Sequence, residues 1–198
     1  MRTLLLFRGA PGCGKSTYIK EHGLEQYVLS ADTLRLMCQG SQETPSGRME
    51  ISPQNDDVVW EMLFKLLEVR MSHGEFTVID ATNSKTAEMN RYKNLAKQYR
   101  YRMYVIDMTN LPIEECKRRN TQREWLKRVP EAAIDKMYAR FATQKVPSGV
   151  TVLPSTTDVM SDLNYCPNDF NQWKKIHVVG DIHGCYTCLN EYLGEMKD

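Results

Sequence analysis

The sequence predicts an α/β fold of the P-loop NTPase type, with a mainly parallel sheet, helices on both of its faces and a helical lid. Short apolar runs alternate with segments whose apolar residues have helical spacing, which is typical of parallel sheets covered on both faces. The first apolar run leads directly into a glycine-rich loop and then a helical segment. A dense basic segment at residues 117–128 supplies the expected lid.

The strands are predicted from apolar runs. Residues 4–7, 76–80 and 103–107 form such runs, and residues 27–29 form a shorter one. Residues 175–179 form one more, near the end of the sequence. Open α/β sheets bind ligands at the carboxyl ends of their strands, so residues that follow these runs are the first candidates for a site.

Helices are predicted between the strands. Residues 15–20 follow the glycine-rich loop, and apolar residues repeat at helical spacing from residue 58 to residue 67, with a stop near residues 73–74. Residues 84–98 also have a helical pattern, and another helix is expected to start at residues 111–112, with Pro112 in its first turn.

Composition divides the chain into three parts. A chain of 198 residues with 41% hydrophobic content can bury one substantial core but is short for two complete domains. Residues 1–153 are expected to form the P-loop domain, and residues 154–174, rich in Ser, Thr, Asp, Asn and Pro, an irregular linker. Residues 175–198 then begin a second domain.

Charge and hydropathy limit the partners and the compartment. The net charge of +1 provides no overall field for a polyanion, so a nucleic-acid contact must come from local clusters of cations. The sequence has neither a signal-peptide core nor a membrane span, which predicts a cytoplasmic protein without a membrane partner. The six scattered cysteines are expected to be free thiols.

The strongest motif is a G-x-x-x-x-G-K-[ST] pattern between the first predicted strand and the first predicted helix. In such a loop, backbone N–H groups and a helix N-terminus hold nucleotide phosphates, while Lys15 reaches the β- and γ-phosphates and Ser16 ligates Mg²⁺. The pattern predicts binding of ATP or GTP and leaves the acceptor open. The predicted nucleotide-binding residues are Gly9, Ala10, Pro11, Gly12, Cys13, Gly14, Lys15, Ser16 and Thr17.

Two charged residues after the run at 27–29 are candidates for the acceptor side. Asp32 can accept the proton of an attacking hydroxyl, and Arg35, one helical turn later, points the same way to hold a phosphate. In the alternative interpretation, Asp32 only caps the next helix.

A third group follows the run at 76–80. Asp80 is placed to hold Mg²⁺ through water, and Thr82 and Asn83 offer neutral hydrogen-bond groups to an acceptor. A Thr or Asn after a strand is also a common helix N-cap, so both interpretations stay open for these two residues.

Two basic stretches have a functional and an ordinary interpretation. Residues 117–128 hold six basic residues and one acid. A lid arginine among them would stabilise negative charge on the transferred phosphoryl group. For most of these cations, however, the solvent-exposed end of a helix is the better explanation. Residues 91–102 hold five cations, three tyrosines and no acid, which suits single-stranded nucleic acid or a solvated amphipathic helix.

Together these motifs resemble the 5′-polynucleotide kinase domain of phage and bacterial RNA end-healing enzymes. The resemblance rests on segments 9–17, 30–35, 78–83 and 119–123, in the same order and spacing. It implies that Lys15 and Ser16 handle the ATP phosphates and Mg²⁺, that Asp32 is the general base and that Arg35 orients the phosphate next to the acceptor hydroxyl. It also implies that Arg123 is the lid arginine on the donor phosphates.

Residues 180–184 resemble the first motif of binuclear metallophosphoesterases, in which the residues matching Asp181 and His183 bind metal. In bacterial end-healing enzymes such a phosphatase, which uses Mn²⁺ or a similar ion, follows the kinase. A binuclear site needs ligands from several strand ends, so residues 175–198 are expected to be inactive alone and to belong to a longer protein.

The predicted function is therefore transfer of the γ-phosphate of ATP to the 5′-OH end of RNA or DNA, as in nucleic-acid end healing. A small-molecule kinase of the same fold, acting on a sugar or nucleoside, is the first alternative. A nucleotide-binding regulatory module is the second. The sequence leaves open the preference for RNA or DNA, the choice of ATP or GTP and the oligomeric state.

Overall fold

The computed structural model describes residues 2–43, 47, 49–51, 55–163 and 185–195. The chain divides into two units, Met1–Tyr165 and Cys166–Asp198. The described part of the second unit consists of residue 185 and helix α8 (Tyr186–Glu195). The strand predicted at residues 175–179 and the predicted metal ligands Asp181 and His183 lie outside the described residues.

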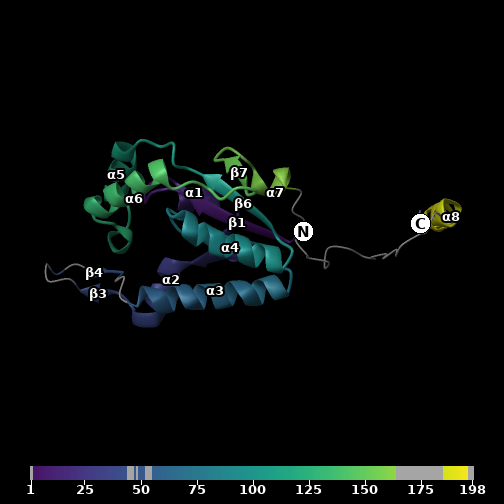
Figure 1. Ribbon diagram of the computed structural model, residues 1–198, viewed down its shortest axis with the longest axis horizontal. Helices are drawn as coiled ribbons and strands as arrows, with labels where there is room; N and C mark the ends of the chain where they lie inside the picture. Colours follow the sequence, from purple (N-terminus) through teal and green to yellow (C-terminus); the bar gives the residue numbers. More distant parts are fainter. Residues whose placement is uncertain (1, 44–46, 48, 52–54, 164–184, 196–198) are drawn as a thin grey trace. The chain divides into compact units, whose positions relative to one another are not determined.

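The first unit is built on a five-stranded parallel sheet in the order β2-β5-β1-β6-β7, of which Figure 1 labels β1, β6 and β7. Central strand β1 pairs with β5 on one side and with β6 on the other, so that Leu5 lies opposite both Val78 and Tyr104. This sheet confirms the predicted P-loop type of α/β fold. Its strands are β1 (Thr3–Arg8), β2 (Val28–Ser30), β5 (Thr77–Asp80), β6 (Arg102–Asp107) and β7 (Thr151–Pro154).

Helices connect the strands and cover both faces of the sheet (Figure 1). A short antiparallel hairpin of β3 (Gln42–Glu43) and β4 (Met49–Glu50) follows α2. The helices of this unit are α1 (Lys15–Glu21), α2 (Ala31–Gln39), α3 (Asp56–Ser72), α4 (Thr86–Gln98), α5 (Ile113–Thr121), α6 (Glu131–Thr143) and α7 (Val159–Asp162). Two short 3₁₀ helices, η1 (Glu25–Tyr27) and η2 (Trp125–Lys127), complete it.

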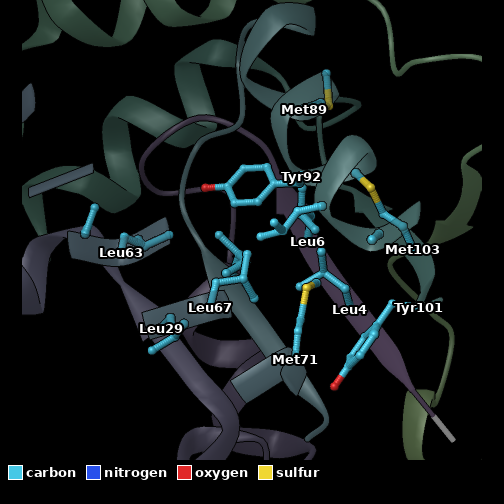
Figure 2. Close-up of a cluster of buried hydrophobic side chains, with 14 of the residues drawn as sticks. Leu4, Leu6, Leu29, Leu63, Leu67, Met71, Met89, Tyr92, Tyr101 and Met103 are labelled. Carbon is cyan, nitrogen blue, oxygen red and sulfur yellow. The ribbon is translucent and has the colours of Figure 1, made fainter. Parts of the chain in front are cut away.

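Strand β1 contributes alternate side chains to two cores. Leu4 and Leu6 pack with side chains of α3 and α4, as Figure 2 shows for the first core. Leu5 and Phe7 pack on the other face, with side chains of α1, α5 and α6. Successive side chains of a strand point to opposite faces, so a strand between two helical layers must be apolar throughout.

The first residues of the predicted linker pack onto this unit. The hydroxyl of Tyr18, in α1, donates to the carbonyl oxygen of Thr157, and burial raises the pKa of Tyr18 to about 12. Val159 of α7 is completely buried in the second core, where Leu163 also packs. The packed chain therefore continues past residue 153 to residue 163.

Candidate functional site

A cleft with a volume of about 550 Å³ lies at the carboxyl ends of β1, β2 and β5. The chain passes from β1 to β2 and β5 on one side and later to β6 and β7 on the other, so the cleft lies where the strand order reverses. Ligands bind at such switch points in open α/β sheets. The cleft is lined by Pro11, Gly12, Gly14, Lys15, Ser16, Thr17, Ala31, Asp32, Arg35, Trp60, Asp80, Ala81, Thr82, Arg118, Arg119, Gln122, Arg123, Val129 and Met137.

The loop between β1 and α1 is packed too closely for side chains at two of its glycines. A Cβ at Gly9 would lie 2.5 Å from Sγ of Cys13, and one at Gly12 would lie 2.2 Å from the carbonyl oxygen of Cys116 in α5. Gly12 also has a φ of +85°, which favours glycine. The loop backbone is thereby held between the sheet and α5. Within the loop, Ala10 and Cys13 are buried.

Lys15 lies over this loop. Its Nζ donates to the carbonyl oxygens of Gly9 and Ala10, at 2.9 and 3.0 Å. Ser16 and Thr17 line the cleft from the first turn of α1, next to the helix N-terminus. An ammonium, two hydroxyls and a helix N-terminus on a glycine loop fit nucleotide phosphates, and a hydroxyl oxygen is a ligand that Mg²⁺ accepts.

Asp32 and Arg35 lie on adjacent turns of α2 and form an ion pair. Arg35 Nη1 donates to Asp32 Oδ1 and Arg35 Nε donates to Asp56 Oδ1 of α3, both at 2.7 Å. Burial lowers the pKa of Arg35, but hydrogen bonds and charges from Asp56 and Asp32 outweigh it, so the pKa lies above its ordinary value. The cap of α2 is Ser30, whose Oγ accepts from Thr33 N. Asp32 is therefore not the N-cap, and its carboxylate is 57% exposed.

Asp80 ends β5 at the floor of the cleft. Burial raises the pKa of Asp80 above its ordinary value, and the nearby charge of Lys15 opposes this shift. Asp32 raises this pKa further, while Arg123 and Lys127 lower it. Asp80 is thus within electrostatic reach of both the glycine loop and the lid.

Thr82 and Asn83 have different places. Thr82 lines the cleft, and its carbonyl oxygen accepts from the backbone N–H of Gly9 at 3.2 Å. Asn83 is buried, has a φ of +44°, and donates from Nδ2 to the carbonyl oxygen of Phe7 at 2.6 Å. The expectation that Asn83 offers a group to an acceptor is corrected, because its amide instead ties β5 to β1. Neither residue caps α4, whose N-cap is Lys85.

The lid is formed by α5, η2 and α6. Lys117 pairs with Asp135 at 2.8 Å and so joins α5 to α6. The buried side chain of Asn120 bonds both the N–H and the carbonyl oxygen of Val129, which fixes the segment between the two helices. Arg123 lines the cleft from this fixed segment.

Two other arginines of the lid pair with one acid. Glu115 accepts from Arg118 at 2.7 Å and from Arg119 at 2.6 Å, and these hydrogen bonds lower the pKa of Glu115 to about 2. Both arginines also line the cleft. Several cations of the basic segment therefore have structural partners, in line with the ordinary interpretation of that stretch.

The basic stretch at residues 91–102 does not expose its tyrosine rings for stacking on nucleic-acid bases. Tyr92 and Tyr101 are buried, and Tyr99 packs against the first core. Arg91 lies over the ring of Phe64, 4.0 Å from its centroid, and Lys93 donates to the carbonyl oxygen of Ser148. These contacts favour a helix that packs on the sheet over a surface for stacking nucleic-acid bases.

Sequence reasoning missed Asp56 and Trp60 of α3. Asp56 holds Arg35, and Trp60 lines the cleft. The available signal was their spacing of four residues, which places both on one face of a helix.

Within the described ranges, no three His, Cys, Asp or Glu side chains come together as a metal centre would require. The described helices are also too short or too polar to cross a lipid bilayer.

Comparison with known proteins identifies related folds. The family model described as AAA domain (AAA_33) matches residues 4–144. A putative kinase from Chloroflexus aurantiacus is 18% identical with a TM-score of 0.55, over 77% of this chain and 86% of that one. Kti12 of Chaetomium thermophilum, solved with ADP-AlF3, is 16% identical with a TM-score of 0.53, over 76% of this chain and 88% of that one.

A third similar structure is the Pnkp1/Rnl/Hen1 complex. It is 25% identical with a TM-score of 0.48, over 59% of this chain and 38% of that one. No curated protein matches the sequence. The family match and the first two solved structures establish a P-loop kinase-like fold.

Proposed function

We propose that this chain, which belongs to the AAA domain family (AAA_33) through residues 4–144, is a kinase. It would transfer the γ-phosphoryl group of ATP to the 5′-OH end of a nucleic acid strand. The supporting observation is that one cleft holds Lys15 and the paired side chains of Asp32 and Arg35. A carboxylate can accept a proton from a hydroxyl, and a guanidinium can hold a phosphate. The terminal nucleotide of a 5′-OH strand presents both groups in one acceptor.

The donor side consists of the glycine loop and the first turn of α1. Backbone N–H groups of the glycine loop and of the first turn of α1, together with the ammonium of Lys15, bind the ATP phosphates. Ser16 would hold Mg²⁺, with Asp80 behind it through water. When bound, Mg²⁺ supplies positive charge that offsets the charge developing on the phosphate oxygens.

The acceptor side performs the proton transfer. The 5′ hydroxyl oxygen attacks the γ-phosphorus as Asp32 takes the hydroxyl proton. The bond between the γ-phosphorus and the β,γ-bridging oxygen breaks, and ADP leaves with the electron pair of that bond. Arg35, held by Asp56, positions the phosphate of the acceptor. Thr82 is a further neutral group on the acceptor side.

The lid places positive charge over the transferred group. Arg123 extends from a segment that the hydrogen bonds between Asn120 and Val129 hold in place, so its backbone is ordered without substrate. We assign residues 1–153, with the packed residues up to 163, to this kinase domain, and residues 175–198 to a separate unit.

The test is transfer of labelled γ-phosphate from ATP to a 5′-OH oligonucleotide, with a 5′-phosphorylated oligonucleotide as a blocked control. Gluconate, other sugars and free nucleosides are assayed in parallel. Label on the 5′-OH strand, with none on the blocked strand, supports the proposal. Label on a small acceptor in place of the oligonucleotide makes the chain a small-molecule kinase. ATP binding without turnover on any acceptor makes it a nucleotide-binding module.

A further inference from the structure

We propose that Trp60 forms a stacking surface for the base of the acceptor's terminal nucleotide, so that the cleft selects a nucleotide over a free sugar. This inference rests on the proposed kinase function. It adds a binding subsite that neither the glycine loop nor the charged residues supply.

The place of Trp60 follows from the contact between α2 and α3. These two helices pack against each other, and Arg35 of α2 donates from Nε to Asp56 of α3 at 2.7 Å. Trp60 is four residues after Asp56, on the same face of α3 and about 6 Å further along its axis. The indole therefore lies one helical turn beyond Asp56, the acid that holds Arg35.

The ring is held in place and still faces the cleft. Trp60 is half-buried, packs against the first core and lines the cleft. Packing on one side restricts the ring to few rotamers, and Trp60 adds an aromatic side chain to the lining of the cleft. Most other side chains around it in the cleft are charged or small, including Asp32, Arg35 and Asp80. A fixed indole in such a cleft suits stacking on a planar ring.

The subsite belongs to the acceptor and not to ATP. The donor phosphates are assigned to the loop that joins β1 and α1, whereas Trp60 shares its helix with the acid that holds Arg35. A nucleotide whose hydroxyl is at Asp32 and whose phosphate is at Arg35 has its base as the remaining planar group. Stacking is tolerant of base identity, because every base has an aromatic face.

The test compares a 5′-OH oligonucleotide with the same strand carrying an abasic terminal nucleotide. For the wild-type chain, kcat/KM should be roughly 5- to 150-fold higher with the base present. Trp60→Leu keeps an apolar side chain but removes the aromatic face, so it should lose most of this preference. Trp60→Phe should keep most of it. Leu66→Ala, half-exposed on the same helix, is the control and should behave as the wild type.

The outcomes separate the two proposals. A wild-type chain that is inactive on both strands overturns the proposed function and this inference with it. A wild-type chain that is active on both strands without a preference for the base overturns this inference alone. So does a Trp60→Leu variant that keeps the preference. Thermal melting of each variant checks folding, and if Trp60→Leu unfolds, the wild-type and Trp60→Phe comparisons still decide.

Discussion

Arg35 holds Asp32 through a hydrogen bond of 2.7 Å from Nη1 to Oδ1 while its Nε holds Asp56. One guanidinium thus connects two carboxylates from two helices, and Asp32 and Arg35 line the same cleft as the glycine loop. The pair joins the proposed base to the proposed phosphate-binding cation, so a change at Asp32 should be made without changing its size.

Asp32→Asn has nearly the same shape and can still accept a hydrogen bond from Arg35, but it cannot serve as a base. We expect kcat for a 5′-OH oligonucleotide to fall by roughly 10²- to 10⁴-fold, with ATP binding retained. Steady-state kinetics with labelled ATP and equilibrium binding of ATP measure the two effects.

The control for this substitution is Glu61→Gln, an exposed acid of α3 that pairs with Lys65 and should leave kcat unchanged. An Asp32→Asn enzyme with wild-type kcat would show that Asp32 has no catalytic role.

Arg123→Ala should lower kcat more than it weakens ADP binding, since a lid arginine acts mainly on charge in the transferred group. We expect kcat to fall by about 10²- to 10³-fold, the range found when one stabilising donor is removed. Calorimetry with ADP and single-turnover transfer provide the comparison. Lys136→Ala, an exposed cation of α6, is the control. Equal losses in both measurements would mark Arg123 as a residue that binds the ground state.

The sequence predicted the buried strands because their position makes them apolar on both faces. β1 has four consecutive apolar residues, and the structure uses them alternately in two cores. β7 escaped prediction because it is mostly exposed at the edge of the sheet and ends at Pro154, so it has no continuous apolar run. Helix α6 was missed as well, although Pro130 before it and Ile134 and Phe141 within it are typical helix signals.

The part of the candidate site that could be predicted is the nucleotide-binding loop, because phosphate binding requires a short, continuous sequence motif. The glycine loop is such a pattern, because Gly12 cannot hold a side chain against Cys116. Asn83 was misjudged because its role depends on a positive φ and on a carbonyl 76 residues earlier in the chain. Trp60 was overlooked because a Trp in an apolar helix is usually a core residue. The long-range contact of Asn83 leaves no local signal.

Asp80→Asn should stabilise the protein at neutral pH. Burial raises the folded-state pKa of Asp80, so the folded chain holds this proton more tightly than the unfolded chain. The stability from this group is complete below the unfolded pKa of about 3.9 and is lost as the pH rises through the folded pKa. We therefore expect Asp80→Asn to raise the melting temperature at pH 7, with a gain that disappears toward pH 4.

Thermal unfolding between pH 4 and pH 8 measures this difference. Asp57→Asn, an exposed acid in the first turn of α3, is the control and should show no such pH-dependent gain. A lower melting temperature for Asp80→Asn at pH 7 would mean that the charge of Asp80 stabilises the fold through Lys15 more than burial penalises it.

Tyr18→Phe tests whether residues 154–163 belong to the P-loop domain. The Tyr18 hydroxyl donates to the carbonyl oxygen of Thr157, and both residues are buried. Phenylalanine would fill the same space and leave that carbonyl without its partner, at a cost of roughly 1–3 kcal/mol. For a chain of this size that corresponds to a melting temperature lower by about 2–12 °C. Tyr186→Phe, in the exposed part of α8, should leave the melting temperature unchanged.

Truncation gives the complementary measurement: a chain that ends after residue 163 keeps Val159 in the second core, whereas one that ends after residue 153 removes it. We expect the longer fragment to melt at a clearly higher temperature and to retain kinase activity. Equal stability of the two fragments, with an unchanged Tyr18→Phe variant, would place the end of the domain at residue 153.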